Sequence, residues 1–390
     1  MTSTRSKLLD YLGGICLFYE RPQWRDAAYA DLQRALVSRR VEAYLKLEAI
    51  DAHGVHIVRI GASAKLSEIT PSHDTTAIAA ALQLEVPDQN WNLDQEILLA
   101  MARSPVAFTF PSISEFDSAI RIRRHTARAA ARATLSFDPH GLERPTDCWT
   151  YHPSTSFTLL PGVSLISALR KTIEPDQNGR AYSFSCYRAS EYVQLLGLAE
   201  HLHEHNPGLL ERIEARWRRC AVMSDEFHQI FMYEVGTIDQ PLPSRYYVPG
   251  DRVWFRNPDE PSSDVYGYEG SWVYYIGEGK FNNFWNSASP YTLTDKCLEI
   301  YHWRDGASRD AGGALIMDEA VVQARVAQSL SDPRACDAIL RRMMRMRDVS
   351  GVYRDGGCID ATRESLRWVC EVSRQMETAA GECDVVARAA

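Results

Sequence analysis

The sequence lacks several patterns that define common classes of protein. It has nine cysteines but no Cys-x-x-Cys pair, which argues against a zinc-ribbon site and against a disulfide framework. No apolar run approaches the roughly 18 residues that a membrane helix requires. A glycine-rich phosphate loop, a dinucleotide fingerprint and a calcium-binding loop are also missing. We therefore expect no nucleotide cofactor, no metal site and no membrane partner.

A surplus of positive charge is missing as well. The 390 residues carry a net charge of −8, whereas general nucleic-acid binders usually carry a basic surplus. One stretch has arginines at helix-like spacing, namely Arg121, Arg123, Arg124, Arg128 and Arg132. They could face phosphate or an acidic partner, but such a run is more often a solvated helix face. We expect no nucleic-acid partner.

The start of the chain does not have the pattern of a secretion signal. Residues 1–20 include Asp10 and two glycines within their apolar part, and no small-residue cleavage site follows. Scattered cysteines in a chain without a signal indicate a reducing compartment. The expected location is the cytoplasm.

What is present indicates a globular α+β protein. Hydrophobic residues make up 45% and charged residues 24% of the chain, which are ordinary values for a packed core. Helical spacing predicts helices over 24–47, 318–347 and 361–376. Alternation and β-branched or aromatic residues predict strands over 55–60 and 298–303. Helices thus come first, a sheet comes late in the chain, and helices return near the end.

Cys186 is the residue with the clearest chemical potential. Ser185 is a plausible N-cap, which places Cys186 in the first turn of a helix over 187–204. Free N–H groups and the helix dipole favour a thiolate there, and Arg188 adds a positive charge. A thiol in such a place can have a pKa below the value of about 8.5 of free cysteine. The alternative is an inert buried cysteine, since cysteine is among the most often buried residues.

A series of short motifs surrounds Cys186 and extends over more than half of the chain. Before the cysteine stand Trp91, Asp94, Gln95, Pro105, Val106, Ser112, Ile113, Asn178 and Gly179; after it stand Ala189, Gly250, Asp251, Asn257, Pro258, Gly270, Lys280 and Phe281. In order and spacing, residues 91–304 resemble the protein-glutamine γ-glutamyltransferase of spore-forming bacteria, a compact transglutaminase.

The resemblance implies a fold and a reaction. The fold is α+β, with a papain-like transglutaminase core related to the NlpC/P60 proteins and built on an antiparallel sheet. The expected organisation is an N-terminal α/β extension over 1–87, the core over 88–310 and a helical C-terminal extension over 311–390. Cys186 matches the nucleophile of the family, which forms a thioester with a carboxamide donor and passes the acyl group to an amine. The family needs no calcium.

The chain departs from the family at the groups that serve the thiol. Ser271 stands where the family has a carboxylate after the glycine, Ser185 replaces a carboxylate before the cysteine, and Phe284 falls near the position of the histidine. Glu269 and His302 are the candidate substitutes, because a bulge could turn Glu269 inward and His302 lies in a predicted late strand. The alternatives are a solvated turn carboxylate and a packed strand histidine. Without a base, aminolysis would be slower by about 10²–10⁴-fold.

Three functions remain open from the sequence. The first is a cysteine-dependent acyltransferase that acts on a protein or small-molecule acyl donor and a primary-amine acceptor. The second is a catalytically degenerate transglutaminase-fold protein that acts as a binding or assembly module. The third is a cysteine peptidase or deamidase, in which water replaces the amine. A depressed pKa of Cys186 would favour the first and third, and dependence on an amine would separate these two.

Overall fold

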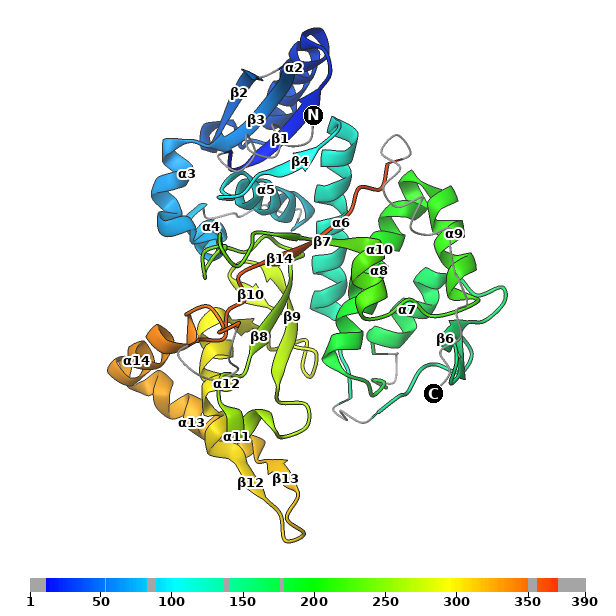
Figure 1. Ribbon diagram of the computed structural model, residues 1–390, viewed down its shortest axis with the longest axis vertical. Helices are drawn as coiled ribbons and strands as arrows, with labels where there is room; N and C mark the ends of the chain where they lie inside the picture. Colours follow the sequence, from blue (N-terminus) through cyan, green and yellow to red (C-terminus); the bar gives the residue numbers. More distant parts are fainter. Residues whose placement is uncertain are drawn as a thin grey trace.

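The computed structural model describes residues 12–52, 54–82, 89–136, 141–175, 179–349 and 356–370, and it confirms a mixed α+β architecture with mostly antiparallel sheets (Figure 1). The helices are α2 (Pro22–Ser38), α3 (Ala64–Ile69), α4 (Ile78–Leu82), α5 (Gln89–Ala102), α6 (Ile113–Arg132), α7 (Leu165–Ile173), α8 (Cys186–His205), α9 (Pro207–Trp217), α10 (Asp225–Phe231), α11 (Glu260–Ser263), α12 (Leu293–Gly306), α13 (Glu319–Ser331) and α14 (Pro333–Met343). Short 3₁₀ turns at Glu42–Tyr44, Pro71–His73 and Thr75–Ala77 complete the helical elements.

A four-stranded sheet lies at the N-terminal end of the molecule (Figure 1). Its order is β2-β3-β1-β4, with bounds Leu45–Ala52, Val55–Ala62, Ile15–Tyr19 and Phe108–Phe110. Strand β3 contains the predicted strand at 55–60, and β1 pairs with it antiparallel but with β4 in parallel. Because β4 belongs to the predicted core, this sheet joins residues from both sides of the expected boundary at 87.

A six-stranded antiparallel sheet occupies the middle of the molecule (Figure 1). Its order is β11-β10-β9-β8-β14-β7, with bounds Tyr291–Thr292, Lys280–Phe281, Gly270–Gly277, Arg252–Arg256, Arg363–Leu366 and Met232–Val235. Strand β14 comes from near the C-terminal end of the chain and lies between β7 and β8. The β5–β6 hairpin (Trp149–His152 and Ser156–Leu159) and the β12–β13 hairpin (Ala307–Arg309 and Leu315–Met317) are separate pairs.

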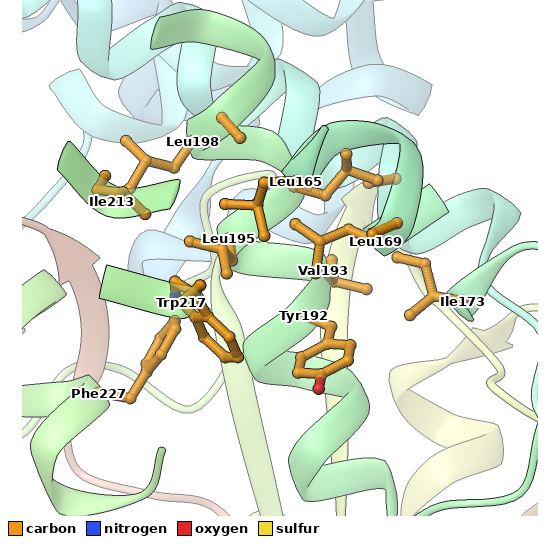
Figure 2. Packing of buried hydrophobic residues seen from close by; sticks show 14 of the residues in the cluster. Leu165, Leu169, Ile173, Tyr192, Val193, Leu195, Leu198, Ile213, Trp217 and Phe227 are labelled. Atoms are coloured by element: carbon orange, nitrogen blue, oxygen red, sulfur yellow. The ribbon is translucent and has the colours of Figure 1, made fainter. Parts of the chain in front are cut away.

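Helix α8 lies at the centre of the largest apolar core. It packs against α6, α7 and α9 and against strand β9 of the six-stranded sheet. Around it, the rings of Tyr192, Trp149 and Trp217 contact one another with centroid separations of 5.6–6.0 Å. Figure 2 shows Tyr192, Trp217 and Phe227 in this cluster together with aliphatic residues of α7 and α8. This core fixes the helix whose first residue is Cys186.

Replacing Trp217 with alanine is expected to lower the free energy of unfolding by about 3–5 kcal/mol, because a large buried ring leaves a cavity. Trp217 is 1% exposed. The measurement is urea denaturation followed by far-UV circular dichroism. Trp24 of α2, which is 48% exposed, is the matched control, and its alanine variant should lose less than about 1 kcal/mol. Equal losses in the two variants would contradict this assignment of the core.

Two predicted helices are wrong in part. The helix predicted over 24–47 ends at Ser38, because the chain turns there and residues 45–47 enter strand β2. The helix predicted over 361–376 contains instead strand β14 (Arg363–Leu366) within its described part, 361–370, and β14 pairs on both sides. Ladder hydrogen bonds and packing in the sheet outweigh the local helical spacing of this segment. Residues 371–376 lie outside the described part of the chain.

The strand predicted over 298–303 is also wrong, because these residues belong to helix α12. The helix begins with a capping box in which Thr292 and Asp295 satisfy each other's backbone N–H groups. Leu293, Cys297 and Ile300 are buried at helical spacing on the side that faces the sheet. This apolar stripe, rather than strand alternation, explains the hydrophobic residues of the segment.

Most of the arginines of α6 are held in contacts within the chain. Arg123 is buried and pairs with Asp251 at 2.7 Å, and Arg124 pairs with Asp94 at 2.8 Å. Arg132 contacts Glu174 at 2.8 Å, so these guanidinium groups fix α6 to its neighbours. Among the described residues, no helix has both the length and the apolar character needed to cross a bilayer.

Candidate active site at the start of helix α8

Cys186 occupies the place that its sequence predicts. It is the first residue of α8, and the side chain of Ser185 accepts a hydrogen bond from the N–H of Arg188 at 3.3 Å. The N-cap prediction is therefore confirmed. Cys186 is half-buried, and Ala189 and Ser190 in the same turns are fully buried. The thiol therefore lies at the first turn of the helix, where the backbone N–H groups have no partner within the helix.

Strand β9 brings a backbone N–H to the thiol. The N–H of Tyr275 donates to Asp251 before β8, so in the antiparallel ladder the N–H groups of Tyr274 and Trp272 point away from β8. Tyr274 N–H accordingly donates to Asn282 Oδ1 at 2.7 Å. The N–H of Trp272 is directed to Cys186 and favours its thiolate. The thiol thus faces the side of β9 opposite β8 at a point that β10 does not reach, beside Ser271 at the position of the family's carboxylate.

A buried lysine supplies positive charge to the site. Lys296 of α12 has a side chain that is 3% exposed, and its Nζ lies 2.6 Å from Glu299 Oε2 and 3.4 Å from Ser271 Oγ. The ammonium also lies over the ring of Tyr291, 3.6 Å from its centroid. Its charge acts on Cys186 and lowers the pKa of that thiol. Lys296 therefore links Ser271, Glu299 and Cys186 in one electrostatic group.

The electrostatics leave a neutral thiol beside a cation. Burial raises the pKa of Cys186 above its ordinary value, and the Trp272 N–H and the Lys296 charge oppose burial without cancelling it. Burial lowers the pKa of Lys296, but Glu299 and Tyr291 outweigh it, so the net direction is upward. The expectation of a depressed Cys186 pKa is wrong, because desolvation exceeds the effect of the helix start. Arg188 instead pairs with Glu191.

The rate of alkylation of Cys186 should rise about tenfold per pH unit between pH 7 and 9, without a plateau. A raised pKa means that the thiolate fraction, which reacts, is still growing at pH 9. The measurement is labelling with iodoacetamide followed by peptide mass spectrometry. Free cysteine, with a pKa of about 8.5, serves as the reference and should level off earlier. A plateau of the Cys186 rate below pH 8 would contradict the raised pKa.

The structure does not bring His302 to the thiol. His302 lies on helix α12, where Nδ1 contacts Asp305 Oδ2 at 2.6 Å and Nε2 contacts Ser329 Oγ of α13 at 2.7 Å. Both ring nitrogens are therefore engaged, one within α12 and the other with α13, and the residue is 7% exposed. This is the packed histidine that the sequence left open as an alternative, although on a helix instead of a strand.

Glu269 lies at the start of β9 but is exposed to solvent. Within the described part of the chain, its side chain accepts only a long contact from the N–H of Gly267, at 3.5 Å, and its backbone oxygen accepts from the N–H of Asn257. The bulge that would turn it inward is not present, because β8 and β9 pair in regular register from Gly270 to Tyr274. Phe284, at the position of the family's histidine, is buried in the core around α8.

An alanine at position 302 should reduce stability but not the reactivity of the thiol. Loss of the contacts to Asp305 and Ser329 should lower the free energy of unfolding by about 1–3 kcal/mol. The alkylation rate of Cys186 in the folded chain should change less than twofold. The control is Glu269→Ala, for which both quantities should stay unchanged. A slower Cys186 in the His302 variant would restore this histidine as a partner of the thiol.

The sequence did not single out Lys296 and Glu299. Both lie in α12, whose first turn was not predicted as helical. The signal that would have identified Lys296 is a charged residue among apolar residues at helical spacing. A lysine at a core position of a helix is unusual unless it is paired. Among the described residues, no cluster of three or more His, Cys, Asp or Glu side chains has a geometry suited to a metal ion.

Comparison with known families assigns the chain to one of them. Residues 75–354 match the family described as TGL, protein-glutamine gamma-glutamyltransferase. Because the match covers more than half of the 390 residues, the chain belongs to this transglutaminase family. The family's name describes an acyl transfer from protein-bound glutamine, and the predicted resemblance is confirmed. A search of curated proteins found no match.

Proposed function

We propose that the chain is a cysteine-dependent acyltransferase in which Cys186 forms a thioester with a carboxamide donor. The proposal is supported by three features that act on one atom, the sulfur of Cys186. The thiol begins helix α8, the Trp272 N–H of β9 is directed at it, and the charge of buried Lys296 acts on it. In a site of low polarity, fixed charges and N–H groups stabilise developing negative charge strongly.

The reaction divides into two acyl transfers. Cys186 Sγ attacks the carbonyl carbon of the donor, the carbon–nitrogen bond breaks, and the thiol proton leaves with the amide nitrogen as ammonia. An amine then attacks the thioester, the carbon–sulfur bond breaks, and the proton of the amine returns to the thiol. Splitting the exchange in this way replaces one difficult step by two easier ones.

Lys296 and Glu299, not Glu269 and His302, have the supporting role in this proposal. The Lys296 ammonium stabilises the thiolate and the oxyanion that follows, and Glu299 keeps the lysine protonated and in place. Ser271 Oγ, 3.4 Å from Lys296 Nζ, fills the place of the family's carboxylate with a neutral hydroxyl. The charged pair thus lies on α12 and not on the strand. The packing of α8 on β9 supports a papain-like core.

A second function is supported by the same thiol. Burial raises the pKa of Cys186, so at neutral pH most molecules hold a thiol and not a thiolate. A catalytically degenerate transglutaminase fold that serves as a binding or assembly module would show this feature. The family's substrates, protein-bound glutamine and an amine, make a polypeptide donor and a primary-amine acceptor the proposed partners of the active form.

The test incubates the full chain with a glutamine peptide and a fluorescent primary amine at pH 8. Covalent incorporation of the amine into the peptide, with release of one ammonia per amine, is the expected result. Conversion of glutamine to glutamate at the same rate with and without amine would assign a deamidase. No change in the peptide, together with no mass gain on Cys186, would support the degenerate module.

A further inference from the structure

A pocket lies on one face of the six-stranded sheet and is lined in part by Trp272 of β9. Its volume is about 370 Å³, which is within the usual range for small-ligand sites. The stacked indoles of Trp254 and Trp272, with centroids 5.8 Å apart, form part of its wall. Trp272 is the residue whose backbone N–H is directed at Cys186. The pocket and the thiol are therefore linked through Trp272, although Cys186 does not line the pocket.

The same face carries two carboxylates directly opposite each other. Glu234 of β7 pairs in register with Glu364 of β14, and Glu364 pairs with Arg252 of β8, so all three side chains share one face. Like charges directly opposite in a sheet are destabilising. Arg252 compensates Glu364 at 2.8 Å, whereas Glu234 is exposed and has no ion pair among the described residues.

The charges that line the pocket leave an excess of one negative. Its carboxylates are Glu234, Asp360 and Glu364, and its guanidinium groups are Arg252 and Arg347. Arg347 pairs with Asp360, as Arg252 does with Glu364. One lining carboxylate, that of the exposed Glu234, therefore has no cationic partner among the described residues. Ile238 and Val349, both more than half exposed, add apolar surface beside it.

Arg252 provides an independent indication of a ligand. Its side chain is 3% exposed, and its Nη2 has no hydrogen-bond partner among the described residues although the atom is buried. Nε donates to Ser190 Oγ, and the guanidinium lies between the rings of Tyr187 and Trp272. A buried donor without an acceptor is unfavourable, and an incoming carbonyl oxygen would satisfy it.

We propose that this pocket is a specificity subsite for a lysine or arginine side chain of the polypeptide whose glutamine reacts at Cys186. The cationic end is held by Glu234 and Glu364, and the methylene stem lies along the indoles, which also attract cations. Arg252 Nη2 donates to a backbone carbonyl of the same polypeptide. The assignment rests on the proposed function, since it concerns the acyl donor of that reaction.

The C-terminal segment of this chain completes the subsite. Asp360 and Glu364 lie beyond residue 354, where the match to the family ends. Strand β14 carries Glu364 into the sheet between β7 and β8, and this insertion creates the opposed carboxylates. Glu234 is accordingly a specificity residue, because it touches the flanking side chain and not the reacting atoms.

The experiment measures binding of two peptides to the full-length Cys186→Ala chain by titration calorimetry at pH 8. The peptides are identical except that the residue next to the central glutamine is lysine in one and glutamate in the other. The lysine peptide should bind about fivefold more tightly, as expected for one partly exposed ion pair. Glu234→Gln should remove this preference, and Glu234→Lys should reverse it.

The matched control is Glu269→Lys, which makes the same charge change at an exposed residue of the sheet that does not line the pocket. The preference for lysine should persist there. Equal affinities of the two peptides, no binding of either, or an equal effect of Glu234→Lys and Glu269→Lys would overturn the proposal. A thioester on wild-type Cys186 is scored separately by mass, so a failed subsite and a failed acyl transfer are distinguishable.

Discussion

The Cys186→Ala chain is expected to incorporate an amine at least about 10³-fold more slowly than the wild type. Removal of a nucleophile leaves only the binding and charge stabilisation of the site, which accelerate a reaction far less than the covalent route. The measurement is initial rate of fluorescent-amine incorporation at saturating glutamine peptide. Because Cys186 is half-buried at the start of α8 and not in the centre of the core, the variant should fold normally.

The control for this prediction is another cysteine that is also only partly buried. Cys336 of α14 packs at the edge of the core that includes α12. Its alanine variant should retain the wild-type rate within about twofold. If Cys336→Ala and Cys186→Ala lost the same fraction of activity, or if Cys186→Ala lost none, the thiol at the start of α8 would not be the nucleophile.

The Lys296→Met chain is expected to lose about 10²–10³-fold in kcat/KM. Methionine keeps most of the volume and removes the charge that stabilises the thiolate and the oxyanion, and losses of this size follow removal of one such group. Without the cation, the pKa of Cys186 should rise further, because the Lys296 charge lowers it in the wild type. The alkylation profile of Cys186 should therefore shift to higher pH.

The methionine variant also leaves Glu299 without its ammonium partner at 2.6 Å. Loss of one partner of a buried ion pair destabilises a protein more than loss of both. The matched variant is Lys296→Met with Glu299→Gln, which should regain stability but not kcat/KM. Lys296→Arg keeps the charge and should retain more activity than methionine. If the double variant regained the activity, the role of Lys296 would be structural.

The start of α8 was predictable because its signals are local. Ser185 has the side chain that caps a helix, and the residues after Cys186 have no strand alternation, so the first turn follows from neighbours in sequence. The order of the motifs from Trp91 to Phe281 was also sufficient to identify the family. What these signals do not contain is the distance from the thiol to any residue far along the chain.

The partners of the thiol were not predictable for that reason. His302 and Lys296 lie on the same helix, and the prediction of a strand over 298–303 placed the histidine toward Cys186. In the helix the two side chains have different neighbours: Lys296 faces Ser271 of β9, whereas His302 faces Ser329 of α13. The capping box at Thr292 and Asp295 was the local signal that would have corrected the element.

The insertion of β14 depends on pairing across more than 100 residues of sequence. Arg363 pairs with Val235 and Glu364 with Arg252, and neither register can be derived from the segment itself. Its helical spacing even predicts the wrong element. The sheet environment decides the conformation, as is usual for short strands whose side chains pack on both neighbours.

The most direct test of the account is the intact mass of the chain after rapid mixing with a glutamine peptide in the absence of amine. Acyl transfer through Cys186 predicts a species heavier than the chain by the mass of the peptide less one ammonia. That species should be located at Cys186 by peptide mapping, be cleaved by hydroxylamine, and be absent from Cys186→Ala. Turnover of the peptide with no such adduct, or an adduct on another residue, would contradict the account.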